Sequence, residues 1–176
     1  MRLAIFGSVL AALLVACQSS FPPMDVVATV ELERYTGKWY EIASLPQRFQ
    51  RGCVATTATY TLRADGRIGV LNECRDESFD GKLRQAEGIA WVSDPSDSDA
   101  KLKVQFFWPF RGDYWIIELD SDYSYVVIGH PSREYLWILS RTPTMKPDRY
   151  ATLLEKIKAH GYALDGLNRT PQPPEL

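Results

Sequence analysis

The sequence has few of the residues on which catalytic and metal sites usually depend. It contains two histidines in 176 residues, and His130 and His160 lie in separate segments, GHPS and KAHG. Two isolated imidazoles make neither a zinc site nor the base of a catalytic triad. The acidic segment DPSDSD lacks the closing Glu and the Gly of a calcium-binding loop. We therefore expect a protein that is not an enzyme and that holds no metal and no cofactor.

An excess of charge of one sign is also absent. The formal net charge is −2, and acidic and basic residues are interspersed along the chain. Such a balance argues against nucleic acids and anionic surfaces as partners. Beyond the first 16 residues the chain has a length that suits one domain with a sizeable core.

The N-terminus carries a long apolar run, which follows Arg2 and ends in the segment LVAC. It is too short to span a bilayer comfortably, so we predict a lipoprotein signal peptide over residues 1–16. LVAC resembles the bacterial lipobox, which implies acylation of Cys17 and a membrane anchor, whereas the alternative is an ordinary secretion signal. Gln18 then implies transfer to the outer membrane. The polar, Pro-containing start of residues 17–30 is typical of a tether between the lipid and a domain over residues 31–176.

Two further cysteines, Cys53 and Cys74, flank a predicted hairpin around ADGR. Pairing about a two-residue turn at Asp65 and Gly66 would place Cys53 opposite position 78. A longer loop or a bulge would shorten that offset, because each shifts the register by a residue or two. Since disulfides persist outside the cytoplasm, we expect a Cys53–Cys74 disulfide rather than two free thiols.

Short β-prone runs separated by turn residues fill the chain up to its last helix. Eight antiparallel strands lose their edges in a sandwich or in a closed barrel, and short connections favour the barrel. The segment KPDRYATLLEKIKAHG has one apolar stripe between Pro147 and Gly161, with Asp148 as N-cap or first-turn acid, so this helix must pack outside the sheet. The sequence thus predicts an all-β, eight-stranded antiparallel up-and-down β-barrel with one C-terminal α-helix. The predicted strands are Trp39–Ser44, Val54–Leu62, Arg67–Glu73, Gln85–Val92, Lys101–Trp108, Tyr114–Leu119, Tyr123–Gly129 and Tyr135–Arg141.

Two motifs carry a family resemblance. GKWYE, with Gly37 and Trp39, resembles the Gly-x-Trp signature of lipocalins, and YLWILSRTP resembles their last strand, which ends in Arg141. With LVAC, RFQRG and FFWPF, the chain is similar to bacterial outer-membrane lipocalins and their apolipoprotein D relatives. The resemblance implies that Trp39 closes one end of the barrel and that Arg141 lies over its ring, both in structural roles. The segment SDYSY departs from the family pattern and leaves open which of Tyr123 and Tyr125 takes the family position.

Side-chain alternation then selects a set of cavity residues. If Arg141 faces the closed end, residues 137 and 139 share its face. The resemblance adds Tyr114, although alternation leaves Tyr114/Ile116 and Trp115/Ile117 equally open because that strand is apolar on both faces. For each candidate cavity residue, the competing interpretation is that it only packs in the barrel core. The candidate ligand-binding residues are Tyr60, Val104, Phe106, Tyr114, Trp137 and Leu139.

A cavity with this lining suits a long apolar chain with a polar head near the opening. We therefore predict a lipid-binding protein of the bacterial outer membrane, anchored through Cys17 and facing the periplasm, that stores, transports or maintains membrane lipids. The expected ligand is a fatty acid such as palmitate, or a lysophospholipid; whether the protein forms a homodimer stays open. One alternative is a lipocalin-fold enzyme acting on an isoprenoid or fatty substrate, with Glu87 as its titrating group. Another is an empty barrel whose FFWPFRGDY loop binds a protein.

Overall fold

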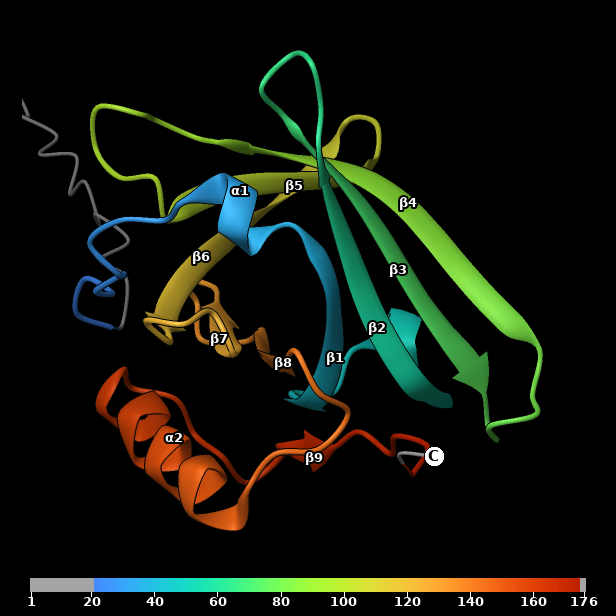
Figure 1. Cartoon of the computed structure of the whole chain (residues 1–176). Helices are drawn as coiled ribbons and strands as arrows, with labels where there is room; N and C mark the ends of the chain where they lie inside the picture. The colour runs from blue at the N-terminus through green and yellow to red at the C-terminus, as the bar shows by residue number, and fades with distance from the viewer. Residues whose placement is uncertain (1–20, 175–176) are drawn as a thin grey trace, which may run out of the picture.

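Antiparallel strands close on themselves in the part of the chain that the computed structural model describes, residues 21–174 (Figure 1). Each strand pairs with the next one along the chain, and β1 pairs with both β8 and β2, which closes the barrel. This confirms the predicted up-and-down barrel, with one short additional strand, β9 (Asn168–Arg169), beside β1. The barrel strands are β1 (Gly37–Ser44), β2 (Cys53–Leu62), β3 (Ile68–Asp76), β4 (Leu83–Val92), β5 (Lys101–Phe107), β6 (Phe110–Leu119), β7 (Tyr125–Gly129) and β8 (Leu136–Ser140).

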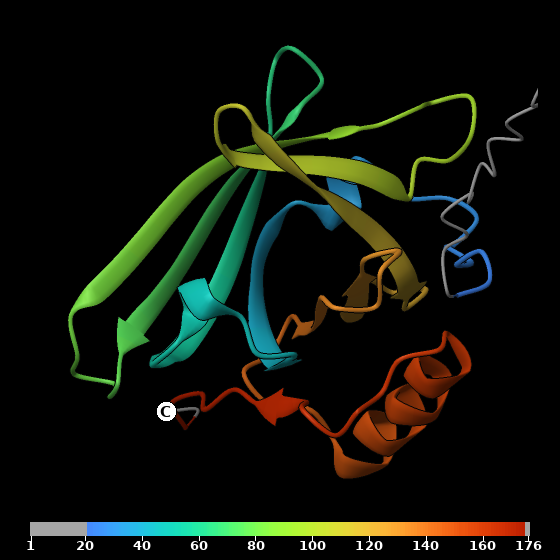
Figure 2. The same ribbon diagram turned by 180° about the vertical axis from the view of Figure 1, so that it is seen from behind.

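The predicted C-terminal helix is α2 (Pro147–Ala159), and it lies outside the barrel in both views (Figures 1 and 2). Leu153 and Ile157 of α2 are buried against outward-facing side chains of β7 and β8. Asp148 is a first-turn acid and not the N-cap, which is Lys146. Two short helices had no predicted counterpart: α1 (Leu32–Tyr35), before β1, and the 3-10 turn η1 (Arg48–Gln50), between β1 and β2.

Alternate residues of the strands form two separate cores. Ile116 and Ile128 belong to the cluster inside the barrel, whereas their neighbours Ile117 and Val127 belong to the cluster under α2. Since directly paired residues point to the same face of a sheet, the pairing of Ile116 with Ile128 fixes the orientation of β6. Tyr114 therefore points inward, which resolves the alternative that the sequence left open.

The closed end of the barrel is built around Trp39, whose side chain is 0% exposed. The indole N–H donates to the carbonyl of Tyr35 at 2.9 Å, and the Arg141 guanidinium carbon lies 3.8 Å from the ring centroid. Arg141 also donates to the carbonyls of Lys38 and Arg34, at 3.0 and 2.7 Å. Gly37 has a φ of +93°, and a Cβ there would lie 3.2 Å from Arg141 Nη1, so the site favours glycine. One guanidinium thus joins β8 to α1 and to the start of β1.

The turn between β6 and β7 completes this closed end. Tyr123 is buried there, and its hydroxyl accepts the backbone N–H of Glu31 at 2.8 Å. Tyr125 belongs instead to the outer cluster, where the guanidinium of Arg149 lies 5.4 Å from its ring centroid. Tyr123 is therefore the residue of SDYSY that helps to close the barrel.

The described N-terminal segment crosses the barrel and does not extend freely from it. Met24 and Val30 are buried, and the N–H of Val27 donates to the carbonyl of Ile116 at 3.0 Å. Contacts with the domain begin at Phe21, since the Arg133 guanidinium lies 5.2 Å from its ring centroid and donates to the carbonyl of Pro22 at 2.8 Å. The predicted signal peptide and Cys17 lie outside the described residues. None of the helices within residues 21–174 has the length and hydropathy needed to cross a membrane.

The expected Cys53–Cys74 disulfide is present, with its Cα atoms 5.4 Å apart. Cys53 pairs with Asp76 and not with position 78, because the loop around Gly66 is longer than two residues and the register shifts between Val54 and Thr57. The structure therefore contains both features that the cysteine spacing suggested, the longer loop and the bulge. The disulfide therefore links residues that are diagonal neighbours across β2 and β3.

Replacing Arg141 with Ala should lower the free energy of unfolding by about 2–4 kcal/mol, because the variant loses the contact with Trp39 and several charge-assisted hydrogen bonds. Denaturant unfolding of the oxidised protein measures this difference. Arg149→Ala is the matched control, since it removes another guanidinium that lies over a tyrosine ring, and it should cost less than about 1 kcal/mol. Equal effects of the two substitutions would contradict the role given to Arg141.

Candidate functional site

Inward-facing side chains divide the barrel interior into a packed half and an open half. Near Trp39 the inward residues are buried, among them Val70, Ile116 and Val126. Other inward residues pack on this cluster yet keep part of their surface accessible, and an inward side chain can only be accessible to space inside the barrel or at its opening. These residues are therefore the inward side chains that a molecule at the opening could contact. The partly exposed inward residues include Val104, Phe106, Tyr114 and Trp137, all from the predicted lining.

The other two predicted lining residues, Tyr60 and Leu139, also point inward but are buried. Leu139 packs in the cluster that surrounds Trp39, so it supports the closed half of the barrel. Tyr60 lies at the boundary between the two halves, because its hydroxyl contacts that of Tyr114 at 2.9 Å. Four of the six candidates thus expose surface inside the barrel, and two support them from below.

Three phenols meet at this boundary: Tyr35 from α1, Tyr60 from β2 and Tyr114 from β6, named here the phenol cluster. The hydroxyls of Tyr35 and Tyr114 are 2.5 Å apart, and Tyr35 and Tyr60 bring their ring centroids to 5.2 Å. Tyr35 and Tyr60 are buried, whereas Tyr114 is partly exposed. Because Tyr114 points inward, it connects the two buried phenols to the inward face of β6.

Burial keeps the phenol cluster uncharged. It raises the pKa of Tyr60 to about 12 and those of Tyr35 and Tyr114 well above the usual value, because removal from water disfavours a phenolate. The neighbouring phenols raise the pKa of Tyr114 further, whereas for Tyr35 the influence of Tyr60 raises the pKa and the hydrogen bond with Tyr114 lowers it. All three groups are therefore neutral hydroxyls at physiological pH.

A carboxylate, Glu41, lies in the same wall and is 4% exposed. It pairs across the sheet with inward-facing Leu139, and its charge contributes to the raised pKa of Tyr60. Its oxygens accept hydrogen bonds from three neutral groups: Ser44 at 2.9 Å, Gln50 at 2.7 Å and Thr170 at 2.5 Å. No Lys, Arg or His within the described residues forms an ion pair with it.

Gln50 connects the loop at the open end to the barrel wall. Its side-chain amide donates to Glu41, and its carbonyl accepts the indole N–H of Trp137 at 3.0 Å. Tyr35, Glu41 and Gln50 were absent from the sequence-based candidates. Of these three residues, only Glu41 could have been assigned from the sequence, because it lies two residues after Trp39 and therefore on the same face of the strand.

Glu87 and His130 lie apart from the contacts that Glu41 and the phenol cluster make within the described residues. Glu87 is exposed and points outward, since its neighbour Gly88 packs against inward-facing Phe106, so the predicted titrating group of an enzyme is not in the cavity. His130 Nδ1 accepts the N–H of Ser132 in a turn, and burial lowers the pKa of His130 although the nearby Asp113 opposes this. Within residues 21–174, no three His, Cys, Asp or Glu side chains gather into a possible metal site.

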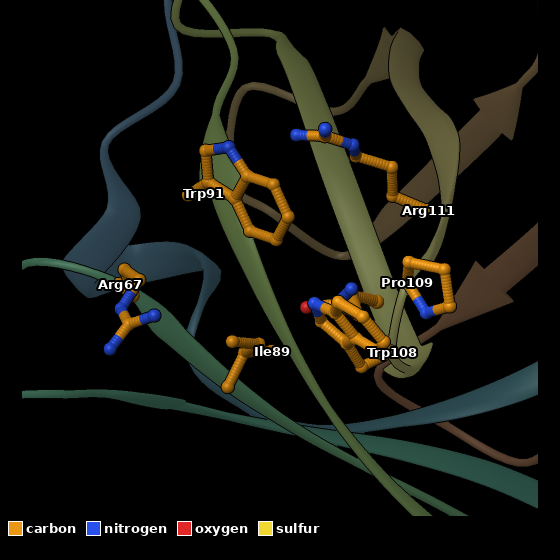
Figure 3. Close-up of a pocket in the computed structure, with 7 residues that line it drawn as sticks. Arg67, Ile89, Trp91, Trp108, Pro109 and Arg111 are labelled. Atoms are coloured by element: carbon orange, nitrogen blue, oxygen red, sulfur yellow. The ribbon is translucent and has the colours of Figure 1, made fainter.

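A pocket of about 560 Å³ lies on the outer face of the barrel, separate from the interior (Figure 3). Its walls come from the outward side of β4 and β5, from the β5–β6 connection with the start of β6, and from Arg67 before β3. The aromatic residues of that loop are exposed: Phe107 by 75%, Trp108 by 86% and Phe110 by 76%. The lining residues are Arg67, Ile89, Trp91, Gln105, Trp108, Pro109 and Arg111.

The burial of Tyr60 predicts a loss of stability at alkaline pH. Its pKa is about 12 in the folded state against 10.0 for a free phenol, so its stabilising contribution is complete below pH 10 and lost as the pH rises through about 12. Between about pH 9 and 11, the free energy of unfolding of Tyr60→Phe should fall by about 1 kcal/mol less than that of the wild type. Urea unfolding at both pH values measures this, with Tyr40→Phe, on the outer face of β1, as the control. Parallel losses in all three proteins would contradict the burial of Tyr60.

Comparison with known proteins places these features in a family. A family model described as a lipocalin-like domain matches residues 30–172. The chain is 48% identical over 163 residues to temperature-induced lipocalin-1 of Arabidopsis thaliana, covering 86% of each chain. It is 40% identical over 163 residues to the outer membrane lipoprotein Blc of Escherichia coli strain K12, covering 92% of this chain and 91% of the relative. It is 32% identical over 161 residues to mouse apolipoprotein D, covering 86% and 82%.

Solved structures agree with the fold at much lower sequence identity. Insecticyanin from the tobacco hornworm Manduca sexta superposes with a TM-score of 0.66 at 20% identity, covering 88% of this chain and 87% of that one. The barrel, the Trp39 closure and the match over residues 30–172 lead to one conclusion. The chain belongs to the lipocalin family.

Proposed function

We propose that this protein is a membrane-anchored lipid-binding protein whose barrel takes up the apolar chain of a fatty acid such as palmitate, or of a lysophospholipid. The observation that carries the proposal is the inward-facing, partly exposed lining of Val104, Phe106, Tyr114 and Trp137. Transfer of a 16-carbon chain from water to such a lining gives on the order of 10 kcal/mol before the cost of immobilisation. That leaves enough for micromolar binding.

The relatives support the location of this function. Blc is an outer membrane lipoprotein, which favours acylation of Cys17, removal of residues 1–16 and a domain anchored at the outer membrane and facing the periplasm. The chain contacts the domain from Phe21 onward, through Arg133, so the proposed anchor at Cys17 is close to the barrel in sequence. A short tether holds the barrel opening close to the lipids that it would store, transport or return.

The enzyme alternative receives no support from the geometry. It needed a titrating group inside the cavity, and Glu87 lies on the outer face. Glu41 is inside, but its two oxygens are occupied by neutral donors. General acid–base chemistry needs a group that exchanges its proton with a substrate within hydrogen-bond reach.

Purified, delipidated protein should bind palmitate or a lysophospholipid in a complex of one ligand per chain, seen by native mass spectrometry and by tryptophan fluorescence. Val104→Trp should weaken binding at least about tenfold, because the larger side chain fills the accessible space inside the barrel. Lys103→Trp is the matched control, since its side chain points outward, and it should leave the affinity unchanged. Failure of the wild type to take up any fatty acid or lysophospholipid would refute the proposed function.

The hairpin formed by β5 and β6 supports contact with a membrane. Three aromatic side chains are exposed together where these two strands meet: Phe107, Trp108 and Phe110. Aromatic residues exposed together in this way are typical of surfaces that enter the interfacial layer of a bilayer.

The triple substitution Phe107→Ser, Trp108→Ser and Phe110→Ser should reduce the binding of the non-acylated domain to phosphatidylethanolamine and phosphatidylglycerol vesicles at least about tenfold. Vesicle co-sedimentation measures this. The affinity for a soluble lysophospholipid should stay the same, because these side chains lie outside the barrel. Unchanged vesicle binding would instead favour a protein as the partner of this loop.

A further inference from the structure

We infer that the pocket on the outer face of β4 and β5, named here the outer pocket, binds the phosphodiester group of an anionic phospholipid while the β5–β6 hairpin contacts a bilayer. The inference rests on the proposed function, because it concerns the same membrane contact. It adds a second lipid site, which lies outside the barrel and holds a head group. The outer pocket has a volume of about 560 Å³ and is lined by Arg67, Ile89, Trp91, Gln105, Trp108, Pro109 and Arg111 (Figure 3).

The first argument is that the outer pocket contains apolar surface that the fold does not use. Ile89 pairs with Gln105, and Trp91 pairs with Lys103, so both apolar side chains point outward with the polar face of β5. Neither belongs to the cluster inside the barrel or to the cluster under α2, and both keep part of their surface accessible. The helix α2 lies on the other side of the barrel (Figures 1 and 2). Large apolar side chains gathered outside both cores are typical of a binding surface.

The second argument is that two guanidinium groups border this apolar surface. Arg111 forms no hydrogen bond or ion pair with any residue that the structure describes, and Figure 3 shows its guanidinium extending toward Trp91. Arg67 is held by Asp65, which accepts from its Nε at 3.0 Å and from its Nη2 at 2.7 Å, so its Nη1 stays available to a ligand. A guanidinium fits the oxygens of a phosphate because its N–H groups form a planar fork.

The third argument is the local charge. Among the described residues no acidic side chain lines the outer pocket. The nearby outward acids are compensated, because Asp113 accepts from Lys103 Nζ at 2.6 Å and Asp65 binds Arg67. Glu87 also points outward on β4, but it is not part of the lining. The formal net charge of −2 gives the whole chain no attraction to anionic surfaces, so a preference for an anionic lipid must come from a local site such as this one.

The position of the outer pocket beside the β5–β6 hairpin identifies the source of the anion. Trp108 belongs both to the wall of the pocket and to the hairpin, where Phe107 and Phe110 are exposed next to it. Indole rings prefer the interfacial layer of a bilayer, which also contains the lipid phosphates. When the hairpin enters that layer, the two guanidinium groups are close to those phosphates. A bilayer phospholipid therefore supplies the phosphodiester, and its glycerol and first acyl carbons cover the apolar surface of the pocket.

Vesicles that differ only in the charge of the head group test the inference. The protein carries Cys17→Ser, which removes the proposed acylation site, and is otherwise wild type. One set of vesicles contains phosphatidylcholine alone, whose phosphate is balanced by its own ammonium group, and the other contains phosphatidylcholine and phosphatidylglycerol in equal amounts. Co-sedimentation should give binding to the mixed vesicles that is at least about fivefold tighter, because each basic residue at the surface favours anionic lipid by about this factor.

Two arginine variants assign the preference to the outer pocket. Arg111→Gln should reduce it from about fivefold to less than about twofold, because it removes the guanidinium that no acid compensates. Arg149→Gln removes the same charge from α2, on the other side of the barrel, and should leave the preference unchanged. Neither substitution should change binding to phosphatidylcholine vesicles or uptake of palmitate by more than about twofold. The melting temperature of each variant shows that it is folded.

A soluble anion separates the bilayer from a free phosphate as the source of the ligand. Titration calorimetry with glycerol 3-phosphate should show no binding tighter than about 1 mM in the absence of vesicles. Tighter binding that is lost in Arg111→Gln would assign the outer pocket to a free phosphate compound and overturn the inference.

The outcomes separate the inference from the proposed function. If the protein takes up palmitate but binds both kinds of vesicle equally, the inference alone is overturned, and this comparison does not depend on any variant. If Arg111→Gln and Arg149→Gln reduce the preference equally, the effect comes from overall charge and the inference is again wrong. If no fatty acid or lysophospholipid is taken up while the preference still depends on Arg111, the proposed uptake fails and the assignment of the outer pocket stands. If neither kind of vesicle is bound, the membrane contact and the inference are overturned together.

Discussion

The contact between Arg141 and Trp39 is the constraint on which the rest of this barrel depends. Trp39 occupies the closed end completely, and Arg141 covers its ring while it donates to carbonyls of α1, β1 and the turn before β7. A guanidinium suits this position because its planar group can lie on a ring and donate in several directions at once. With this end sealed, water and ligands reach the interior from one side only. The raised pKa values of the phenol cluster follow from that exclusion of water.

The polar groups inside the barrel are arranged by depth. Uncharged phenols lie above the packed half, whereas the carboxylate of Glu41 joins the wall to the loop at the open end through Gln50. Gln50 also binds Trp137, so one loop residue positions both an acidic and an aromatic member of the wall. A change in this loop therefore alters the lining without any change in the strands.

Sequence reasoning succeeded where one face of a strand is polar and failed where both faces are buried. On β5 the lysines mark the outer face, and Val104 and Phe106 were assigned inward by alternation alone. On β6 the outer face is also apolar, because α2 covers it through contacts such as Ile117, so alternation left Tyr114 undecided. Tyr35 and Gln50 lie in single turns, α1 and η1, which are too short for any periodic pattern.

The distribution of exposed apolar surface gives the proposed function a physical route. Exposed aromatic side chains gather at the β5–β6 hairpin, partly exposed apolar side chains face inward from the strands, and the part of the interior near Trp39 is packed. A lipid that leaves a bilayer at the barrel opening moves from one apolar environment to another. Exposure of its chain to water would cost about 0.8 kcal/mol for each methylene, so a route without that exposure lowers the barrier to transfer by many times the thermal energy. The same argument explains why closure at Trp39 matters, since an opening at both ends would let water follow the lipid and reduce the gain from burying its chain.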